Sequence, residues 1–179
     1  MKSVLLSIQP YYVFLIIAQL MGWDIPQRKT EEVRKDLPKD KAWDKNTYIY
    51  CSKNQKSYKQ IPAKYRPLME KFLGKVVGVF VCDNIRRGRA DNAIAAYYHN
   101  NPDETCLSDL ELREYATTAR KPLYFWRISG LTVYDTPKEL REFKKRVKKC
   151  TNGVWYAVRE SITRPPQSWC YVEAVYEVC

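Results

Sequence analysis

The sequence is poor in the residues from which most metal and cofactor sites are built. Its 179 residues include one histidine, His99, and only six glycines. The six cysteines include no pair at C-x-x-C spacing, which argues against a zinc site of the usual kind. It has no Gly-rich phosphate loop and no G-x-S-x-G motif, and no residue near His99 suggests a catalytic partner. We therefore predict no metal and no cofactor.

Long uninterrupted hydrophobic runs are also missing. Residues 1–22 are largely apolar, but Gln9 and Pro10 divide them into halves that are each too short to cross a bilayer. Their only charged residue is Lys2, and no small-x-small cleavage site follows, so we expect neither a signal peptide nor an anchor. Cys82 and Cys170 lie in apolar runs, where a free cysteine acts as a small core residue. Reduced cysteines favour a cytoplasmic protein.

Positive charge is what the sequence has in excess. The 31 Lys and Arg residues against 20 Asp and Glu residues give a net charge of +11. A surplus of this size predicts a polyanionic partner, with nucleic acid as the first candidate and an anionic membrane surface as the second. A solvated basic surface without a partner is the alternative.

The hydrophobic pattern predicts a single domain over residues 1–179. Period-2 alternation and short apolar runs predict strands at 3–8, 30–35, 46–52, 75–83, 154–158 and 169–176, and either two strands at 123–126 and 130–134 or one bent strand across both. Helical spacing and capping residues predict helices at 10–22, 62–73, 91–98, 108–115 and 137–149. The expected class is α+β, a small mixed β-barrel of about six strands flanked by helices.

Three basic clusters could bind phosphates. They are the predicted helix 137–149, with seven Lys or Arg residues, the loop Arg86-Arg87-Gly88-Arg89, and the segment 28–35. Aromatic residues that could stack on bases lie near basic or stiff segments: Trp126 precedes Arg127, and Trp169 follows the Pro165-Pro166 loop. These rings could equally belong to the core.

The strongest candidate for chemistry is the cluster Lys29, Thr30, Glu32 and Arg34. On a strand, Thr30, Glu32 and Arg34 would share one face, with Lys29 opposite or at the strand entry. A carboxylate between two cations could orient a ligand or act as a base. A structural ion pair is the alternative.

The same cluster belongs to a series of motifs that resembles the ASCH domain family, whose fold is PUA-like. Ser7-Ile8-Gln9-Pro10, a helix and then the segment 28–35, R-K-T-E-E-V-R-K, is similar to the family's opening of S-I-x-P, a helix and G-x-K-T-x-E-x-R. Further similar segments follow in order along nearly the whole chain, at 48–51, 74–83, 124–129, 133–140 and 162–172.

The resemblance implies a barrel with a basic cleft beside the first helix, variable insertions at 53–73 and 84–106, and binding of RNA or a modified nucleotide, with RNA favoured over DNA. No membrane or obligate protein partner is implied. The cleft residues carried over are Lys29, Thr30, Glu32 and Arg34, and by position Trp126, Arg127, Ser129, Arg164, Gln167 and Trp169.

The resemblance also leaves two other functions open. Some small ASCH proteins are amidohydrolases that act on acylated cytidine with a Lys, a Thr and a Glu, and a ribonuclease-like activity is a related possibility. Lys29 matches the catalytic Lys, but Glu32 stands where that family has the Thr. Lys29 and Glu32 are the candidate catalytic residues. A transcription-linked protein-interaction module is the other alternative.

Overall fold

A computed structural model describes residues 1–40, 42–88, 104–119 and 122–173. Its centre is a five-stranded sheet with the order β10-β1-β3-β4-β7. β1 pairs in parallel with β3, and all other neighbours in this sheet are antiparallel. The strands are β1 (Lys2–Ile8), β3 (Trp43–Cys51), β4 (Val76–Val81), β7 (Ser129–Lys138) and β10 (Trp169–Glu173).

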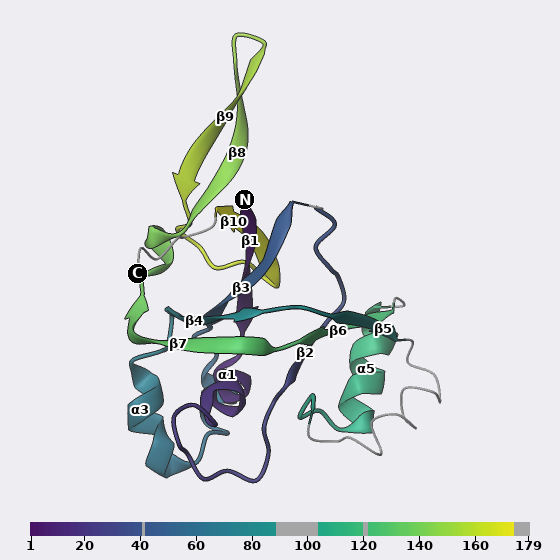
Figure 1. The fold of residues 1–179 in the computed structure, drawn as a ribbon, viewed down its shortest axis with the longest axis vertical. Helices are drawn as coiled ribbons and strands as arrows, with labels where there is room; N and C mark the ends of the chain where they lie inside the picture. The colour runs from purple at the N-terminus through teal and green to yellow at the C-terminus, as the bar shows by residue number, and fades with distance from the viewer. Residues whose placement is uncertain (41, 89–103, 120–121, 174–179) are drawn as a thin grey trace.

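A second sheet continues from the edge of the first. It has the order β2-β6-β5 and consists of β2 (Glu31–Arg34), β5 (Ile85–Gly88) and β6 (Leu123–Arg127). β4 leads into β5, and β6 leads into β7 (Figure 1). Because β4 pairs with β7 and β5 pairs with β6, these two stretches of chain run side by side through both sheets. The α+β class is confirmed. The described strands form three open sheets, and a closed barrel is not found among them.

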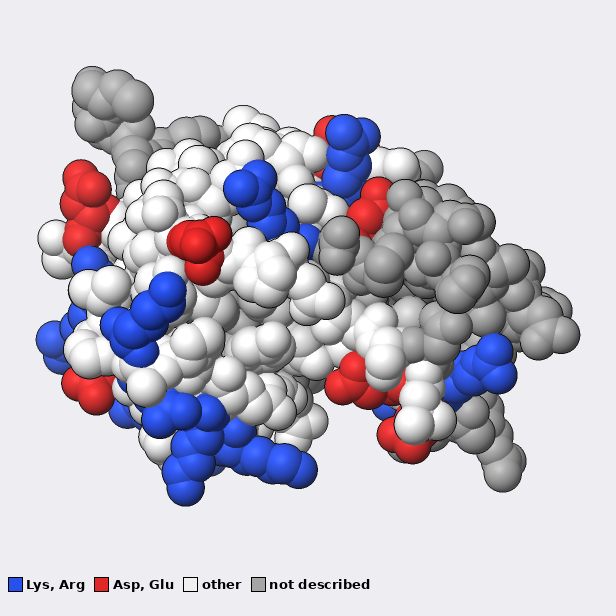
Figure 2. All heavy atoms as spheres, turned by 90° about the horizontal axis from the view of Figure 1, so that it is seen from below, with Lys and Arg blue, Asp and Glu red and all other residues white. Residues whose placement is uncertain are grey.

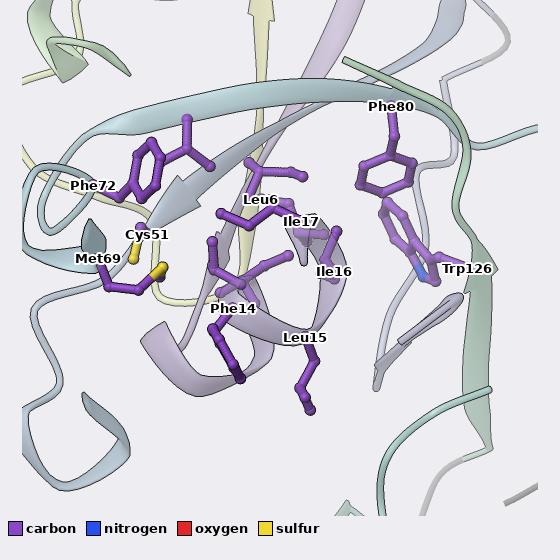
Figure 3. Packing of buried hydrophobic residues seen from close by; sticks show 14 of the residues in the cluster. Leu6, Phe14, Leu15, Ile16, Ile17, Cys51, Met69, Phe72, Phe80 and Trp126 are labelled. Atoms are coloured by element: carbon purple, nitrogen blue, oxygen red, sulfur yellow. The ribbon is translucent and has the colours of Figure 1, made fainter. Parts of the chain in front are cut away.

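The first strand and helix form the middle of the core. Pro10 occupies the start of α1 (Pro10–Ile17), where its missing N–H leaves no hydrogen bond broken. Phe14 and Ile17 of this short helix are at most 1% exposed, and they pack with β1 and with Met69 in one hydrophobic cluster (Figure 3). The prediction of a helix over 10–22 was right in position but too long, since α1 ends at Ile17 and a turn leads to Gly22, whose φ is +65°.

Short helices surround the sheets. The predicted helix 62–73 is present as two consecutive turns, the 3-10 turn η1 (Ala63–Tyr65) and α3 (Arg66–Glu70), after the single turn α2 (Gln55–Tyr58). The capping box predicted at Ser108 is confirmed: its backbone N–H donates to Glu111 Oε2 at 2.8 Å, and α5 (Asp109–Ala119) follows. The predicted helix 91–98 lies outside the described residues.

The predicted helix at 137–149 was wrong. The segment forms one 3-10 turn, η2 (Leu140–Glu142), and then β8 (Lys144–Thr151), which pairs along its whole length with β9 (Val154–Ser161). The turn between them contains Asn152 with φ 51° and Gly153 with φ 79°. Asn-Gly is the preferred dipeptide for a two-residue hairpin turn, because both positions need positive φ. Pairing with β9 therefore outweighs the helical spacing of Leu140, Phe143 and Val147.

None of the helices in the described parts of the chain is long and apolar enough to cross a membrane.

Candidate functional site

A pocket of about 550 Å³ lies where the end of β1, the start of α1, β2 and α5 meet. The first three of these elements come from the beginning of the chain, and α5 comes from more than 70 residues later. Of the residues predicted from the sequence, Lys29, Glu32, Arg34 and Gln167 line this pocket. Three of the four residues singled out as the strongest candidate for chemistry, all except Thr30, therefore line a cavity of a size typical for small ligands.

Glu32 is held between two cations in this pocket. Its Oε1 lies 2.9 Å from Arg34 Nη2, and its Oε2 lies 3.4 Å from Lys29 Nζ. The three side chains are only 2–11% exposed. Glu32 and Arg34 are two residues apart on β2, so they project from the same face of the strand. Lys29 lies just before β2, and its side chain approaches Glu32 from the N-terminal end of the strand.

Backbone carbonyl groups fix the two cations from behind. Arg34 Nη2 donates to the Ser7 carbonyl oxygen at 2.7 Å, and Lys29 Nζ donates to the Thr105 carbonyl oxygen at 2.5 Å. Lys29 Nζ also lies 4.9 Å from the centre of the Tyr12 ring. These bonds connect Arg34 to β1 and Lys29 to the segment before α5. Because Glu32 lies between the two cations, its position depends on β1, on β2 and on that segment.

Two polar atoms of this cluster remain without hydrogen bonds. Glu32 Oε2 and Arg34 Nε are buried and have no hydrogen-bond partner among the described residues. Buried polar atoms in folded proteins are nearly always hydrogen-bonded, so Glu32 Oε2, which has only the ion pair with Lys29, and Arg34 Nε are candidate partners for a polar ligand.

Four of the pocket residues that the sequence did not indicate come from helices. They are Tyr12 of α1 and Glu111, Glu114 and Tyr115 of α5. The spacing of three and four residues in α5 places its three on one helix face, and this signal was available in the sequence. What the sequence could not show is that this face would lie opposite β2.

The two tyrosines supply rings and hydroxyl groups to the cavity. Burial, with smaller contributions from Glu111 and Glu32, raises the pKa of Tyr12 to about 12. Burial also raises the pKa of Tyr115, and the positive charge of Arg34 reduces that rise. Both hydroxyl groups therefore keep their protons at neutral pH and can donate hydrogen bonds. Lys35 Nζ lies 4.2 Å from the centre of the Tyr115 ring.

The pocket is not the basic cleft that the resemblance implied. Lys29 and Arg34 line it together with three carboxylates, Glu32, Glu111 and Glu114. Its charge is mixed, so phosphate binding inside the cavity is disfavoured. The excess of positive charge lies elsewhere on the molecule.

The remaining predicted residues lie away from the pocket. Thr30 is exposed, and Arg86 pairs with Glu31 at 2.5 Å and with Glu104 at 3.3 Å. Arg87, Arg127 and Arg164 are exposed, and the nearest carboxylate oxygen recorded for Arg127 is that of Asp83, at 3.9 Å. These arginines remain available to solvent but do not converge with Glu32.

The aromatic candidates belong mainly to the core. Trp126 is fully buried, with ring centres 5.8 Å from Trp43 and 6.2 Å from Trp169. Trp169 is half-buried and contacts Tyr171 edge-on. Ser129 is half-buried, and its hydroxyl has no hydrogen-bond partner among the described residues. The core interpretation of Trp126 that the sequence left open is therefore the correct one.

A second pocket of about 550 Å³ adjoins the first and shares Gln9, Tyr12 and Glu111 with it. Its other lining residues include Lys56 and Gln60, which belong to the predicted insertion 53–73. The two pockets together form a polar path along α1. In the described parts of the chain no group of His, Cys, Asp and Glu side chains is arranged to hold a metal ion.

This arrangement defines an α+β domain whose polar pocket lies beside its first helix. No protein-family model matches the chain, and no curated protein matches it in sequence. Two crystal structures of ZmASCH from Zymomonas mobilis, one of a tyrosine-to-phenylalanine mutant and one of a serine-to-alanine mutant, are similar to it. The identities are 15% and 13%, and each TM-score is 0.56. The alignments cover 97% and 96% of this chain and 91% and 88% of those chains. The chain has the ASCH fold, as the sequence motifs predicted.

Proposed function

We propose that this chain is a nucleic-acid-binding module that takes one unstacked base, of RNA in preference to DNA, into the pocket at Glu32. The observation that carries the proposal is Glu32, a carboxylate that lines a cavity of about 550 Å³ and whose buried Oε2 has the Lys29 ammonium at 3.4 Å but no hydrogen-bond partner among the described residues. A carboxylate in this position can accept from the amino group of a base, as Glu and Asp do with cytosine.

The side chains around Glu32 suit a planar ligand better than a phosphate. Tyr12 and Tyr115 offer rings for stacking and hydroxyl groups for donation. Glu111 and Glu114 would repel a phosphate that entered the cavity. Lys29 and Arg34 offset the charge of Glu32, so a neutral base can occupy the pocket without leaving an isolated buried charge.

Phosphates would be bound outside the pocket. Segment 53–75 contains seven Lys or Arg residues and one acidic residue, Glu70. Figure 2 shows Lys and Arg gathered on the underside of the molecule, toward the side on which α3 lies in Figure 1. Lys56 of this segment lines the second pocket, which joins the first at Tyr12. A strand with its base at Glu32 could therefore run along α1 toward these cations. RNA is favoured because unpaired bases in loops and ends are its usual recognition targets.

The test is a salt titration of binding to short single-stranded RNA, duplex RNA and single-stranded DNA. Glu32→Gln keeps the shape of the side chain but replaces one acceptor oxygen by an amide donor. We expect it to weaken single-stranded RNA binding by about tenfold, the cost of a bad contact to a base edge, without changing the salt dependence. Asp135→Asn, which neutralises an exposed carboxylate on β7 outside the pocket and segment 53–75, is the control. Binding that is unaffected by Glu32→Gln, or no binding to any of these ligands, would refute the proposal.

Hydrolysis of a modified nucleoside or RNA is the second candidate. It is favoured by the 3.4 Å distance between Lys29 Nζ and Glu32 Oε2 inside the pocket, because an ammonium group beside a carboxylate can polarise a carbonyl while the carboxylate acts as base. Lys29→Met and Glu32→Gln should then both abolish turnover of acylated nucleosides while each variant stays folded. Turnover that survives in either variant excludes this mechanism.

A further inference from the structure

The hairpin formed by β8 and β9 projects from the body of the protein (Figure 1). Its strands pair without interruption from Lys144 opposite Ser161 to Thr151 opposite Val154. At its base Arg146 Nε and Arg159 Nε both donate to Glu173 Oε1 at 3.0 Å, which fastens the hairpin to β10. The outer half of the hairpin extends beyond this anchor.

Positive charge dominates the hairpin. Its two strands contain six Lys or Arg residues and one acidic residue, Glu160. Lys149 pairs with Glu160 at 2.7 Å. Lys144 and Lys148 are exposed, and neither forms an ion pair with any described residue. Three cations therefore remain after the internal pairs are formed, and two of them, Lys144 and Lys148, are exposed, whereas Lys145 is half-buried.

Large apolar side chains are exposed at the outer end of the hairpin. Trp155 is 69% exposed, Val154 66% and Tyr156 43%. Lys148, Trp155, Tyr156 and Ala157 line one depression of about 650 Å³. The small Ala157 side chain lies opposite Lys148 in the ladder and two residues from Trp155, on the same face of the hairpin, which leaves room beside the indole ring.

The order of side chains on one face resembles a binding strip. Residues opposite each other in an antiparallel ladder project from the same face, so Lys144, Arg146 and Lys148 lie in a row that leads to Trp155 opposite Cys150. Successive residues of such a row are about 6.8 Å apart. This spacing is comparable to the distance between neighbouring phosphates of an extended single strand.

We propose that the β8–β9 hairpin is a second contact for single-stranded nucleic acid, separate from the pocket. One base stacks on Trp155, and Lys148 and Lys144, which are two row positions apart, bind two phosphates of the same strand that are separated by one further phosphate. The combination of stacking rings with a row of cations is how proteins hold single strands without reading their sequence. The inference rests on the proposed function in one respect only, namely that the ligand is nucleic acid. The pocket would select one base, and the β8–β9 hairpin would hold the backbone of the same nucleic-acid strand.

The experiment is a fluorescence-anisotropy titration of the full chain with a short, unstructured, labelled single-stranded RNA. We expect Trp155→Ala to weaken binding by roughly tenfold, the loss of one stacked base, and Trp155→Phe to restore most of it. Lys144→Ala/Lys148→Ala should weaken binding and reduce the slope of log affinity against log salt by about 1.4, or about 0.7 for each lost phosphate contact. Lys39→Ala/Lys45→Ala, which removes the same charge from the body, should leave affinity nearly unchanged.

The outcomes separate the two proposals. If the hairpin variants bind like the wild type while Glu32→Gln binds weakly, the hairpin proposal is wrong and the pocket proposal stands. If the wild type binds no nucleic acid, both are wrong. If Trp155→Ala instead changes the elution volume of the free protein, the tip is a self-association surface. If the hairpin variants lose binding only to anionic phospholipid vesicles, it is a membrane contact. Either of the last two results overturns the hairpin proposal.

Discussion

Glu32 and Arg34, two residues apart on β2, form a buried ion pair with 2.9 Å between Oε1 and Nη2. Arg34 Nη2 also donates to the Ser7 carbonyl oxygen, so the same group joins β2 to β1. Arg34 therefore has two roles: it connects β2 to β1, and it holds Glu32 at the wall of the pocket.

Removal of Arg34 should destabilise the protein strongly. Arg34→Ala leaves Glu32 with Lys29 as its one remaining cationic partner among the described residues, and it leaves the Ser7 carbonyl without this donor. Breaking a buried pair typically costs about 3–5 kcal/mol of the free energy of unfolding, which urea denaturation would measure. Lys75→Ala, which breaks a surface pair with Glu139, should cost less than about 1 kcal/mol. Equal losses in the two variants would show that the pocket pair is not specially stabilising.

The neighbours Leu68 and Met69 of α3 should respond very differently to truncation. Met69 is fully buried in the main cluster, and Leu68 is 46% exposed. Met69→Ala should lower the free energy of unfolding by about 2–5 kcal/mol because it opens a cavity, whereas Leu68→Ala should change it by about 0.5 kcal/mol or less. Thermal and urea unfolding of the two variants would check this. If Leu68→Ala were the more destabilising variant, α3 would pack against the core with the face that carries Leu68 instead of the face that carries Met69.

Glycine is required at position 78 for a steric reason. A Cβ at Gly78 would lie 2.3 Å from the Thr132 carbonyl oxygen of the neighbouring strand. Gly78→Ala should therefore disrupt the β4–β7 pairing and give little folded protein, as judged by far-UV circular dichroism. Gly153→Ala is the control: it has a positive φ of 79° but nothing within 4 Å, so its cost should be near the roughly 1 kcal/mol of a left-handed residue. A well-folded Gly78→Ala variant would contradict the close approach of Gly78 to the Thr132 carbonyl oxygen.

Two buried thiols should make the protein less stable in alkali. Burial raises the pKa of Cys51 and of Cys82 from 9.0 to about 12. Between pH 9 and pH 12 the unfolded chain releases these protons while the folded chain retains them, so the free energy of unfolding falls as the pH rises. Urea denaturation at pH 8 and pH 10.5 would show the decline. Cys51→Ala/Cys82→Ala should show a smaller decline, and an unchanged decline would exclude the thiols as its source.

Local signals predicted much of the fold. The Ser3–Ile8 strand, the apolar strand at Val76–Val81 and the capping box at Ser108 follow from sequence periodicity and capping chemistry, and each is present. The largest error in secondary structure was the segment after Pro137, where helical spacing was weighted above the Asn152-Gly153 turn signal. Pairing with a strand further along the chain decided the outcome there.

The candidate site was predictable only in part, because it joins distant segments. Lys29, Glu32 and Arg34 come from one short stretch and were found from its motif. Tyr12 and the α5 residues reach the same cavity through packing that no local pattern contains. Trp126 is the reverse case: a tryptophan beside an arginine suggests a binding platform, but its ring is fully buried, close to Trp43 and Trp169.

The order of strands in the central sheet also bears on how the chain folds. β1 lies between β3 and β10, and it pairs with β10 from Lys2 opposite Glu173 to Leu6 opposite Trp169. This ladder joins residues about as far apart in sequence as the described chain allows, and contacts of high sequence separation slow folding. During synthesis β1 can pair with β3 early but keeps one edge open until β10 has been made. Until β10 has been made, the nascent chain therefore has an apolar strand with one unpaired edge, which makes this stage vulnerable to aggregation.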